Sequence, residues 1–285
     1  MRCAASCDSG PAAGRAVTAA ALACLALAST WQAAVLRSDD LRRQERPGGR
    51  TYRSGHGWSD QQTLMRRHRG HPAPMLASAG LLVAAGLPGR TGAAISVTCC
   101  AVIALWTARY TPTRFTSLCL TLLAAALLLD RSAVLISVIP SHAGALVASF
   151  CAAQLYLVAG IRKLRSPQFL SGRVVLDSFA YATLQASAGS RDFLPLIRPE
   201  QLSTLVVDRR VQLACRAAAV GAAAAELALG LGAVGLLPTV LTLTLAILSH
   251  VAFLLVSPVR IMPFTSAAVG LLFLATTHPI MAGIS

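Results

Sequence analysis

Long apolar runs constrain this chain more than any other feature of its sequence. An α-helix needs about 20 apolar residues to cross a bilayer, and eight runs approach or exceed that length. They cover residues 16–36, 73–88, 92–108, 115–139, 143–161, 211–236, 239–257 and 261–278. A single soluble core does not need 55% hydrophobic residues in a chain of 285. We therefore expect an all-α polytopic integral membrane protein, a bundle of about eight transmembrane helices.

Two of these runs leave the number of spans open by one or two. The run 73–88 is short, and the run 115–139 contains Asp130 and Arg131. These neighbours either neutralise each other inside the bilayer or mark the point where the helix leaves it. Pro140 follows soon afterwards and favours a boundary nearby.

Two long polar segments interrupt the apolar runs. Residues 37–72 hold nine arginines and four acids but few large apolar residues, so we expect a flexible loop without a core. Residues 162–210 form the second segment, in which 174–184 have the apolar spacing of an interfacial helix. We divide the chain into an N-terminal helix and Arg-rich loop (1–72), a transmembrane domain (73–278) and a tail (279–285).

The formal net charge of +14 indicates membrane topology rather than nucleic-acid binding. The basic residues lie between apolar runs, without an aromatic-interleaved basic module. If residues 37–72 are cytoplasmic, residues 162–210 are cytoplasmic too, and the N-terminus lies outside. The first run resembles a secretory signal, but the cationic segment after it favours an uncleaved helix. We expect a multi-pass protein of the inner plasma membrane, with lipid and no nucleic acid as a partner.

Cysteine and histidine usage points away from thiol and metal chemistry. Six of the eight cysteines lie in or beside apolar runs, and Cys3 and Cys7 lie near the N-terminus. No Cys-x-x-Cys pair and no zinc-ligand spacing occurs. The spacing of His56, His68 and His71 matches no metal motif, so we expect solvated loop histidines and no metal site.

Three ionisable residues in or beside apolar runs are the candidate catalytic residues. Lys163 is the only lysine, since the other 24 of the 25 basic residues are arginines. A desolvated lysine can lose its proton and act as a base or nucleophile, whereas arginine effectively cannot. Glu226 and His250 lie inside the sixth and seventh runs, where a carboxylate at a helix centre costs about 2.5–3.5 kcal/mol to insert.

Each of the three also has a structural explanation. A lysine at a helix end often reaches toward the headgroups, and a buried acid or histidine needs only one neighbour as a hydrogen-bond partner. Their occurrence in three runs favours one shared interior site formed by Lys163, Glu226 and His250. Ala222 and Gly230, one turn on either side of Glu226, would let another helix approach closely.

The stretch around Lys163 resembles a family signature. Residues 156–164 read Tyr-Leu-Val-Ala-Gly-Ile-Arg-Lys-Leu, and Gly172 follows. This resembles the aromatic-x-x-Ala-Gly-x-x-Lys-Leu…Gly signature of the horizontally transferred transmembrane (HTTM) domain family, which is related to the membrane part of vitamin K-dependent gamma-carboxylase. The resemblance covers about residues 75–277, and Glu226, His250 and Pro263-Phe264 follow in the family's order.

The resemblance implies a role for Lys163. In the carboxylase, the lysine of this motif deprotonates a reduced quinone, and oxygen chemistry then generates a stronger base that takes a proton from glutamate. It thus implies Lys163 as the base, a reduced quinone as cofactor and a secreted precursor peptide as partner. The carboxylase acts on the membrane face opposite to the one where the cation count places Lys163, so the two expectations conflict.

Two hypotheses follow. The first is a small bacterial-type HTTM-domain protein, either a gamma-carboxylase-like enzyme or a maturation factor for a secreted peptide. The second rests on DoxX- and MauE-like membrane proteins, which carry a similar Ala-Gly-x-x-Lys followed by Glu and glycines. In that case the chain is a non-enzymatic membrane subunit, and Lys163 only anchors a helix. A transporter ranks third, because the sequence contains no inverted repeat.

Overall fold

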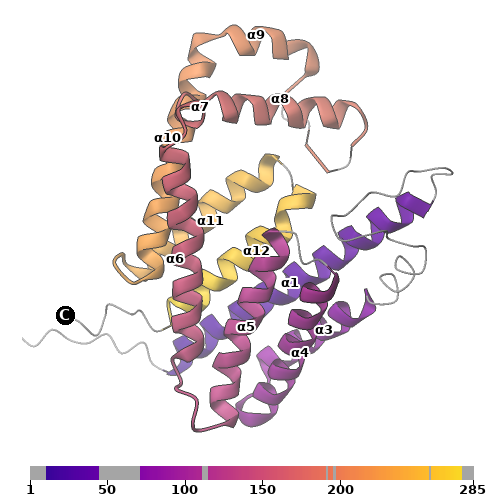
Figure 1. Cartoon of the computed structure of the whole chain (residues 1–285), viewed down its shortest axis with the longest axis vertical. Helices are drawn as coiled ribbons and strands as arrows, with labels where there is room; N and C mark the ends of the chain where they lie inside the picture. Colours follow the sequence, from indigo (N-terminus) through magenta and orange to yellow (C-terminus); the bar gives the residue numbers. More distant parts are fainter. Residues whose placement is uncertain are drawn as a thin grey trace, which may run out of the picture.

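A computed structural model describes most of the chain, and its regular elements are helices (Figure 1). It describes residues 11–44, 71–110, 115–190, 192–194, 197–256 and 258–277. Most of the predicted Arg-rich loop and all of the tail 279–285 lie outside these residues. Within the described ranges no strand occurs, which agrees with the predicted all-α fold class.

All eight predicted apolar runs form helices. They are α1 (Pro11–Gln44), α3 (Pro72–Gly86), α4 (Gly89–Tyr110), α5 (Phe115–Leu135), α6 (Ala143–Leu164), α10 (Arg209–Ala233), α11 (Thr239–Val256) and α12 (Pro258–Ala275). Among the described residues, α1, α4, α5, α6 and α10 contain five stretches long and apolar enough to cross a membrane. Helices α3, α11 and α12 contribute shorter apolar stretches. The chain is therefore a multi-pass membrane protein whose apolar helices contact the lipid bilayer.

Two helices, α1 and α5, end at other residues than the ends of their apolar runs. Helix α1 continues past the predicted end at residue 36 as far as Gln44. All but one of the added residues are polar, but they include neither proline nor glycine, so no residue there interrupts the helix. Helix α5 contains Asp130 and Arg131 and ends at Leu135. Arg131 Nε lies 3.1 Å from Asp130 Oδ2, so the two neighbours form an ion pair within the span.

The second polar segment forms a cap of short helices over one end of the bundle. The cap comprises α7 (Pro167–Leu170), α8 (Arg173–Ser187), a 3-10 turn (Pro199–Gln201) and α9 (Leu202–Val207). Helix α8 confirms the helix predicted over 174–184 and lies across the end of the bundle (Figure 1). Ser166 caps α7 by accepting a hydrogen bond from the Phe169 amide at 3.2 Å, and Pro167 occupies the first helical position.

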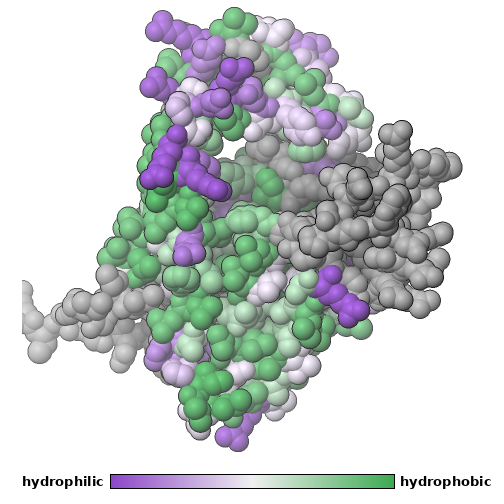
Figure 2. Space-filling model, in the orientation of Figure 1, coloured by the Kyte–Doolittle hydropathy of each residue, from purple (hydrophilic) through white to green (hydrophobic). Residues whose placement is uncertain are grey.

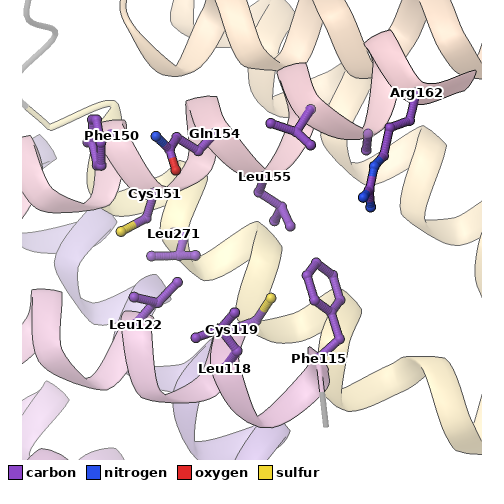
Figure 3. Close-up of a pocket in the computed structure, with 12 residues that line it drawn as sticks. Phe115, Leu118, Cys119, Leu122, Phe150, Cys151, Gln154, Leu155, Arg162 and Leu271 are labelled. Atoms are coloured by element: carbon purple, nitrogen blue, oxygen red, sulfur yellow. The ribbon is translucent and has the colours of Figure 1, made fainter. Parts of the chain in front are cut away.

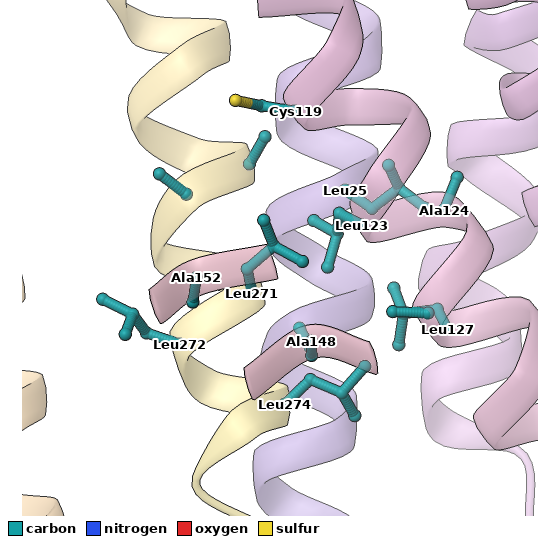
Figure 4. Close-up of a cluster of buried hydrophobic side chains, with 14 of the residues drawn as sticks. Leu25, Cys119, Leu123, Ala124, Leu127, Ala148, Ala152, Leu271, Leu272 and Leu274 are labelled. Atoms are coloured by element: carbon teal, nitrogen blue, oxygen red, sulfur yellow. The ribbon is translucent and has the colours of Figure 1, made fainter. Parts of the chain in front are cut away.

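Leucine and alanine fill the core between α1, α5, α6 and α12. Leu25, Leu123, Leu127 and Leu271 are each fully buried there (Figure 4). Alanines between them, such as Ala148, let the helix backbones approach closely. Most of the large apolar side chains in this core therefore contact protein rather than lipid.

His71 departs from the expectation of a solvated loop histidine. Only 1% of its surface is exposed, directly before α3. Its ring packs edge-on against Trp106 of α4, with the ring centroids 6.4 Å apart. The prediction was wrong because α3 begins immediately after His71 and carries it into the bundle.

Cations gather at the end of the bundle that carries the cap. Successive long helices alternate in direction, so α1 and α6 both end there and α10 begins there (Figure 1). The cations at this cap end include Arg37, Arg109, Arg162, Lys163, Arg165, Arg173, Arg198, Arg209, Arg210 and Arg216. Arg15, Arg90 and Arg131 lie at the opposite end. Figure 2 shows hydrophobic side chains over much of the bundle and hydrophilic ones concentrated toward the cap.

Candidate functional site

The structure brings Lys163 and Glu226 into direct contact. Lys163 lies in the last turn of α6, and its Nζ donates a hydrogen bond to Oε1 of Glu226 in the middle of α10. The two side chains are 23% and 9% exposed. The carboxylate that is costly to insert thus has a cationic partner on a neighbouring helix.

Two glycines allow α6 and α10 to cross closely at this ion pair. Leu227 lies against Gly160, where an added Cβ would come within 2.9 Å of the Leu227 side chain. Leu157 lies against Gly230 in the reciprocal arrangement, and a Cβ there would come within 2.5 Å of Leu157 Cγ. The prediction that Gly230 admits another helix is confirmed, and that helix is α6.

The third predicted residue, His250, forms a hydrogen bond with Tyr156. The Tyr156 Oη and His250 Nε2 atoms are 2.6 Å apart, and both residues are almost fully buried. Tyr156 lies on α6, two turns before Lys163 and on the same side of the helix. One helix therefore positions both Lys163 and the hydroxyl group that holds His250.

Aromatic rings join these two pairs into one site. The Phe253 ring centroid lies 5.4 Å from Lys163 Nζ and 5.9 Å from the centroid of the His250 ring. Phe169 of α7 covers Lys163 from the cap, with its ring centroid 5.3 Å from Nζ. Phe264 of α12 lies 5.9 Å from the His250 ring. We call Lys163, Glu226, Tyr156 and His250 the polar cluster.

The polar cluster keeps unused hydrogen-bonding capacity. Within the described part of the chain, Glu226 Oε2 and His250 Nδ1 are buried and have no hydrogen-bond partner. Buried polar atoms are normally paired, so these two are positioned to bind a further polar group. Glu226 Oε2 accepts a hydrogen bond when the carboxylate is ionised. His250 Nδ1 donates one if Nε2 accepts the Tyr156 proton, and accepts one in the other tautomer.

The chemistry available to the polar cluster is proton transfer. An amine, a carboxylate, an imidazole and a phenol are all present, and aromatic rings surround them. No group of three or more metal-ligating side chains is found among the described residues. The six described cysteines are free, and none belongs to the cluster.

Sequence reasoning found three members of the polar cluster and missed the fourth. Tyr156 is the aromatic residue of the signature, but its hydroxyl group was not assigned a partner. A tyrosine in an apolar run needs a hydrogen-bond partner for its hydroxyl group, and that requirement is the signal that points to a buried histidine. Phe169 and Phe253 carry no comparable signal, because a phenylalanine in an apolar segment is ordinary.

Comparison of the chain with protein-family models, with curated proteins and with solved structures finds no match.

Proposed function

We propose that this chain is an acid–base enzyme of the HTTM type, embedded in the inner plasma membrane, with Lys163 as the base. The observation that supports the proposal is the partly buried Lys163–Glu226 ion pair beside the Tyr156–His250 hydrogen bond. In this proposal all eight apolar helices span the membrane, and the cation-rich cap end faces the cytoplasm.

Glu226 gives Lys163 a route to the neutral amine that a base requires. Transfer of the ammonium proton from Nζ to Oε1 converts an ion pair into an amine and a carboxylic acid, with no change in net charge. In a low-dielectric site this neutral pair avoids the desolvation penalty of two buried ions. The amine can then accept a proton from a substrate hydroxyl group, which becomes an anion beside the new ammonium.

The residues of the site also fit the cofactor that the resemblance implies. A reduced quinone, when bound, supplies acidic hydroxyl groups and two electrons for reaction with oxygen. Glu226 Oε2 and His250 Nδ1 offer unpaired polar atoms to such hydroxyl groups, and Phe253 offers an aromatic face. Lys163 would hold the proton taken from a hydroxyl group of the reduced quinone, and His250 would orient the oxygen atom of that hydroxyl group. A precursor peptide would meet the polar cluster on the cytoplasmic side, before its export.

Replacement of Lys163 by arginine tests the base role. Lys163→Arg keeps the positive charge opposite Glu226, but arginine cannot release its proton. In lipid nanodiscs, the unmodified chain should consume oxygen when a reduced quinone is added, and Lys163→Arg should abolish that rate. The matched control is Arg165→Lys, which exchanges the same two residue types on an exposed position and should keep the rate. A full rate in Lys163→Arg would exclude Lys163 as the base.

The orientation is tested by thiol labelling from each side of the membrane. Gln168→Cys places a thiol on the cap, and Ser141→Cys places one at the opposite end; both positions are exposed. In a background without native cysteines, an impermeant reagent added to intact cells should label Ser141→Cys only. Labelling of Gln168→Cys from outside would reverse the proposed orientation.

One observation favours a second function, that of a non-enzymatic DoxX- or MauE-like subunit. The ion pair lies at the crossing where Leu227 packs on Gly160 and Leu157 packs on Gly230, so it could serve only to lock α6 onto α10. In that case Lys163→Arg is silent in every functional assay, and the purified chain retains a stable partner subunit.

A further inference from the structure

A groove runs between α5 and α6, and part of α12 forms its floor (Figure 3). Its volume is about 390 Å³, and most of its lining is apolar, including Leu118, Leu122, Leu155 and Leu271. Phe115 and Phe150 stand at its rim and are 58% and 62% exposed. Because α5 and α6 are apolar enough to span a membrane, the groove opens toward the lipid hydrocarbon.

One end of the groove carries a cation, Arg162. Arg162 lies in the last turn of α6 and is exposed, and in the described part of the chain it forms no ion pair. Figure 3 shows its guanidinium group directed across the groove toward Phe115. A guanidinium group at the membrane boundary is complementary to a phosphate group in charge and in hydrogen-bonding geometry.

The groove has the length of one membrane leaflet. From Phe150 to Arg162 the lining extends about 18 Å along α6, at about 1.5 Å per residue. Half of a hydrocarbon core of about 30 Å is about 15 Å. A lipid chain can therefore lie in the groove while its headgroup stays at the level of Arg162. A free phosphate ion would leave the apolar part of the groove unfilled.

We propose that this groove binds one anionic phospholipid, whose phosphate contacts Arg162 and one of whose acyl chains lies between α5 and α6. The cation-rich cap end supports this assignment, because the positive-inside rule places it at the cytoplasmic leaflet, where anionic lipids attract such clusters. The site is separate from the polar cluster. Arg162 and Lys163 are consecutive and point about 100° apart around α6, one toward the groove and the other toward Glu226.

Substitution of Gln154 can show whether the groove holds a lipid or a helix from a second copy of the chain. It is exposed in the groove, about 12 Å along α6 from Arg162, so it lies too deep to contact a headgroup. If a second copy of the chain covered the groove, the Gln154 amide would be the group that pairs across the interface. Loss of this amide should therefore weaken a dimer but leave the binding of a phospholipid unchanged.

Native mass spectrometry of the purified full chain tests the proposal with phosphatidylglycerol and phosphatidylcholine as probes. The unmodified chain should retain one phosphatidylglycerol at least tenfold more strongly than phosphatidylcholine. Arg162→Gln should remove this preference, whereas Arg165→Gln, an exposed arginine outside the groove, should keep it. Leu155→Trp, which fills the groove, should lower retention of both lipids.

Three results would overturn the proposal. Equal retention of the two lipids by the unmodified chain would exclude selection by charge, and unchanged selectivity in Arg162→Gln would exclude Arg162 as its source. A dimer that Gln154→Leu dissociates would assign the groove to a second copy. Arg162 is exposed, so Arg162→Gln should fold normally. The test of lipid selectivity therefore stands even if Leu155→Trp does not fold.

Discussion

Two regions of the bundle solve the problem of buried polar groups in different ways. Between α1 and α3, and between α4 and α5, neutral pairs of hydroxyl groups form contacts from one helix to the other. Ser29 Oγ and Ser78 Oγ are 2.6 Å apart, and Thr107 Oγ1 and Thr121 Oγ1 are 2.7 Å apart. Between α6, α10 and α11 the polar contacts are ionisable groups: the Lys163–Glu226 ion pair, with the Tyr156–His250 hydrogen bond adjacent.

The two kinds of polar contact differ in how much they cost the protein to bury, and this difference sets the candidate site apart from the rest of the bundle. A hydrogen bond between membrane helices is worth about 0.6 kcal/mol on average, so a hydroxyl pair is inexpensive to keep and to lose. Removal of one partner from a buried ion pair costs about 3–5 kcal/mol. Groups that are this costly to bury are usually tied to function in membranes. If the comparison holds, substitutions in the two regions should differ several-fold in their effect on stability.

The largest expected effect is that of Glu226→Ala. It leaves the Lys163 ammonium without its partner and should lower the free energy of unfolding in mixed micelles by about 3–5 kcal/mol. The double variant Lys163→Met with Glu226→Leu removes both charges and should recover most of this loss. A loss below about 1 kcal/mol in Glu226→Ala would show that the ion pair is no more important to the fold than a hydroxyl pair.

Gly160→Val should have the next largest effect. The added side chain meets Leu227 and forces α6 away from α10, which should cost about 1–3 kcal/mol in the same unfolding measurement. Gly221→Val inside α10 is the matched control, because an added Cβ there meets no neighbouring atom within 4 Å. Equal losses in the two variants would indicate helix propensity rather than close packing as the cause.

Tyr156→Phe should have a smaller effect on stability and a distinct effect on His250. The variant leaves His250 Nε2 buried without a partner, at a cost of about 1–3 kcal/mol, with the lower part of the range expected because the ring still packs. The NMR signals of the His250 imidazole nitrogens should shift in Tyr156→Phe. Unchanged nitrogen signals would contradict the hydrogen bond. Tyr181→Phe, on the exposed side of α8, should leave them unchanged.

The smallest effect is expected for Ser29→Ala. It removes the contact with Ser78 between α1 and α3 and should cost about 0.6 kcal/mol. The Ser78 hydroxyl group keeps a local acceptor, the Pro74 carbonyl oxygen at 2.6 Å, so no unpaired donor remains. A loss as large as that of Glu226→Ala would remove the distinction between the two regions.

The helices themselves could be predicted from the sequence because each depends mainly on the hydropathy of its own consecutive residues. Each of the eight apolar runs became a helix, and the amphipathic stretch 174–184 became α8. The rotation of one helix against another could not be predicted in the same way. The contacts of Gly160 with Leu227 and of Gly230 with Leu157 fix that rotation, and each joins residues far apart in the chain.

The residues of the candidate site were predictable only in part. Lys163, Glu226 and His250 stand out because an ionisable side chain is unusual in an apolar run. Tyr156 and Phe253 do not stand out, since aromatic residues are common in such runs. The burial of His71 was also not predictable, because it depends on where α3 begins and on the position of Trp106.

The adjacency of Arg162 and Lys163 makes α6 sensitive to insertions and deletions. One residue changes the direction of every later side chain by about 100°. A single deletion between Gly160 and Lys163 would keep the Leu227 contact but turn the lysine away from Glu226. Length changes in the 136–142 connection, which precedes the helix, leave this angular relation intact. Natural variation in length should therefore be tolerated before α6 begins and excluded from its last turn.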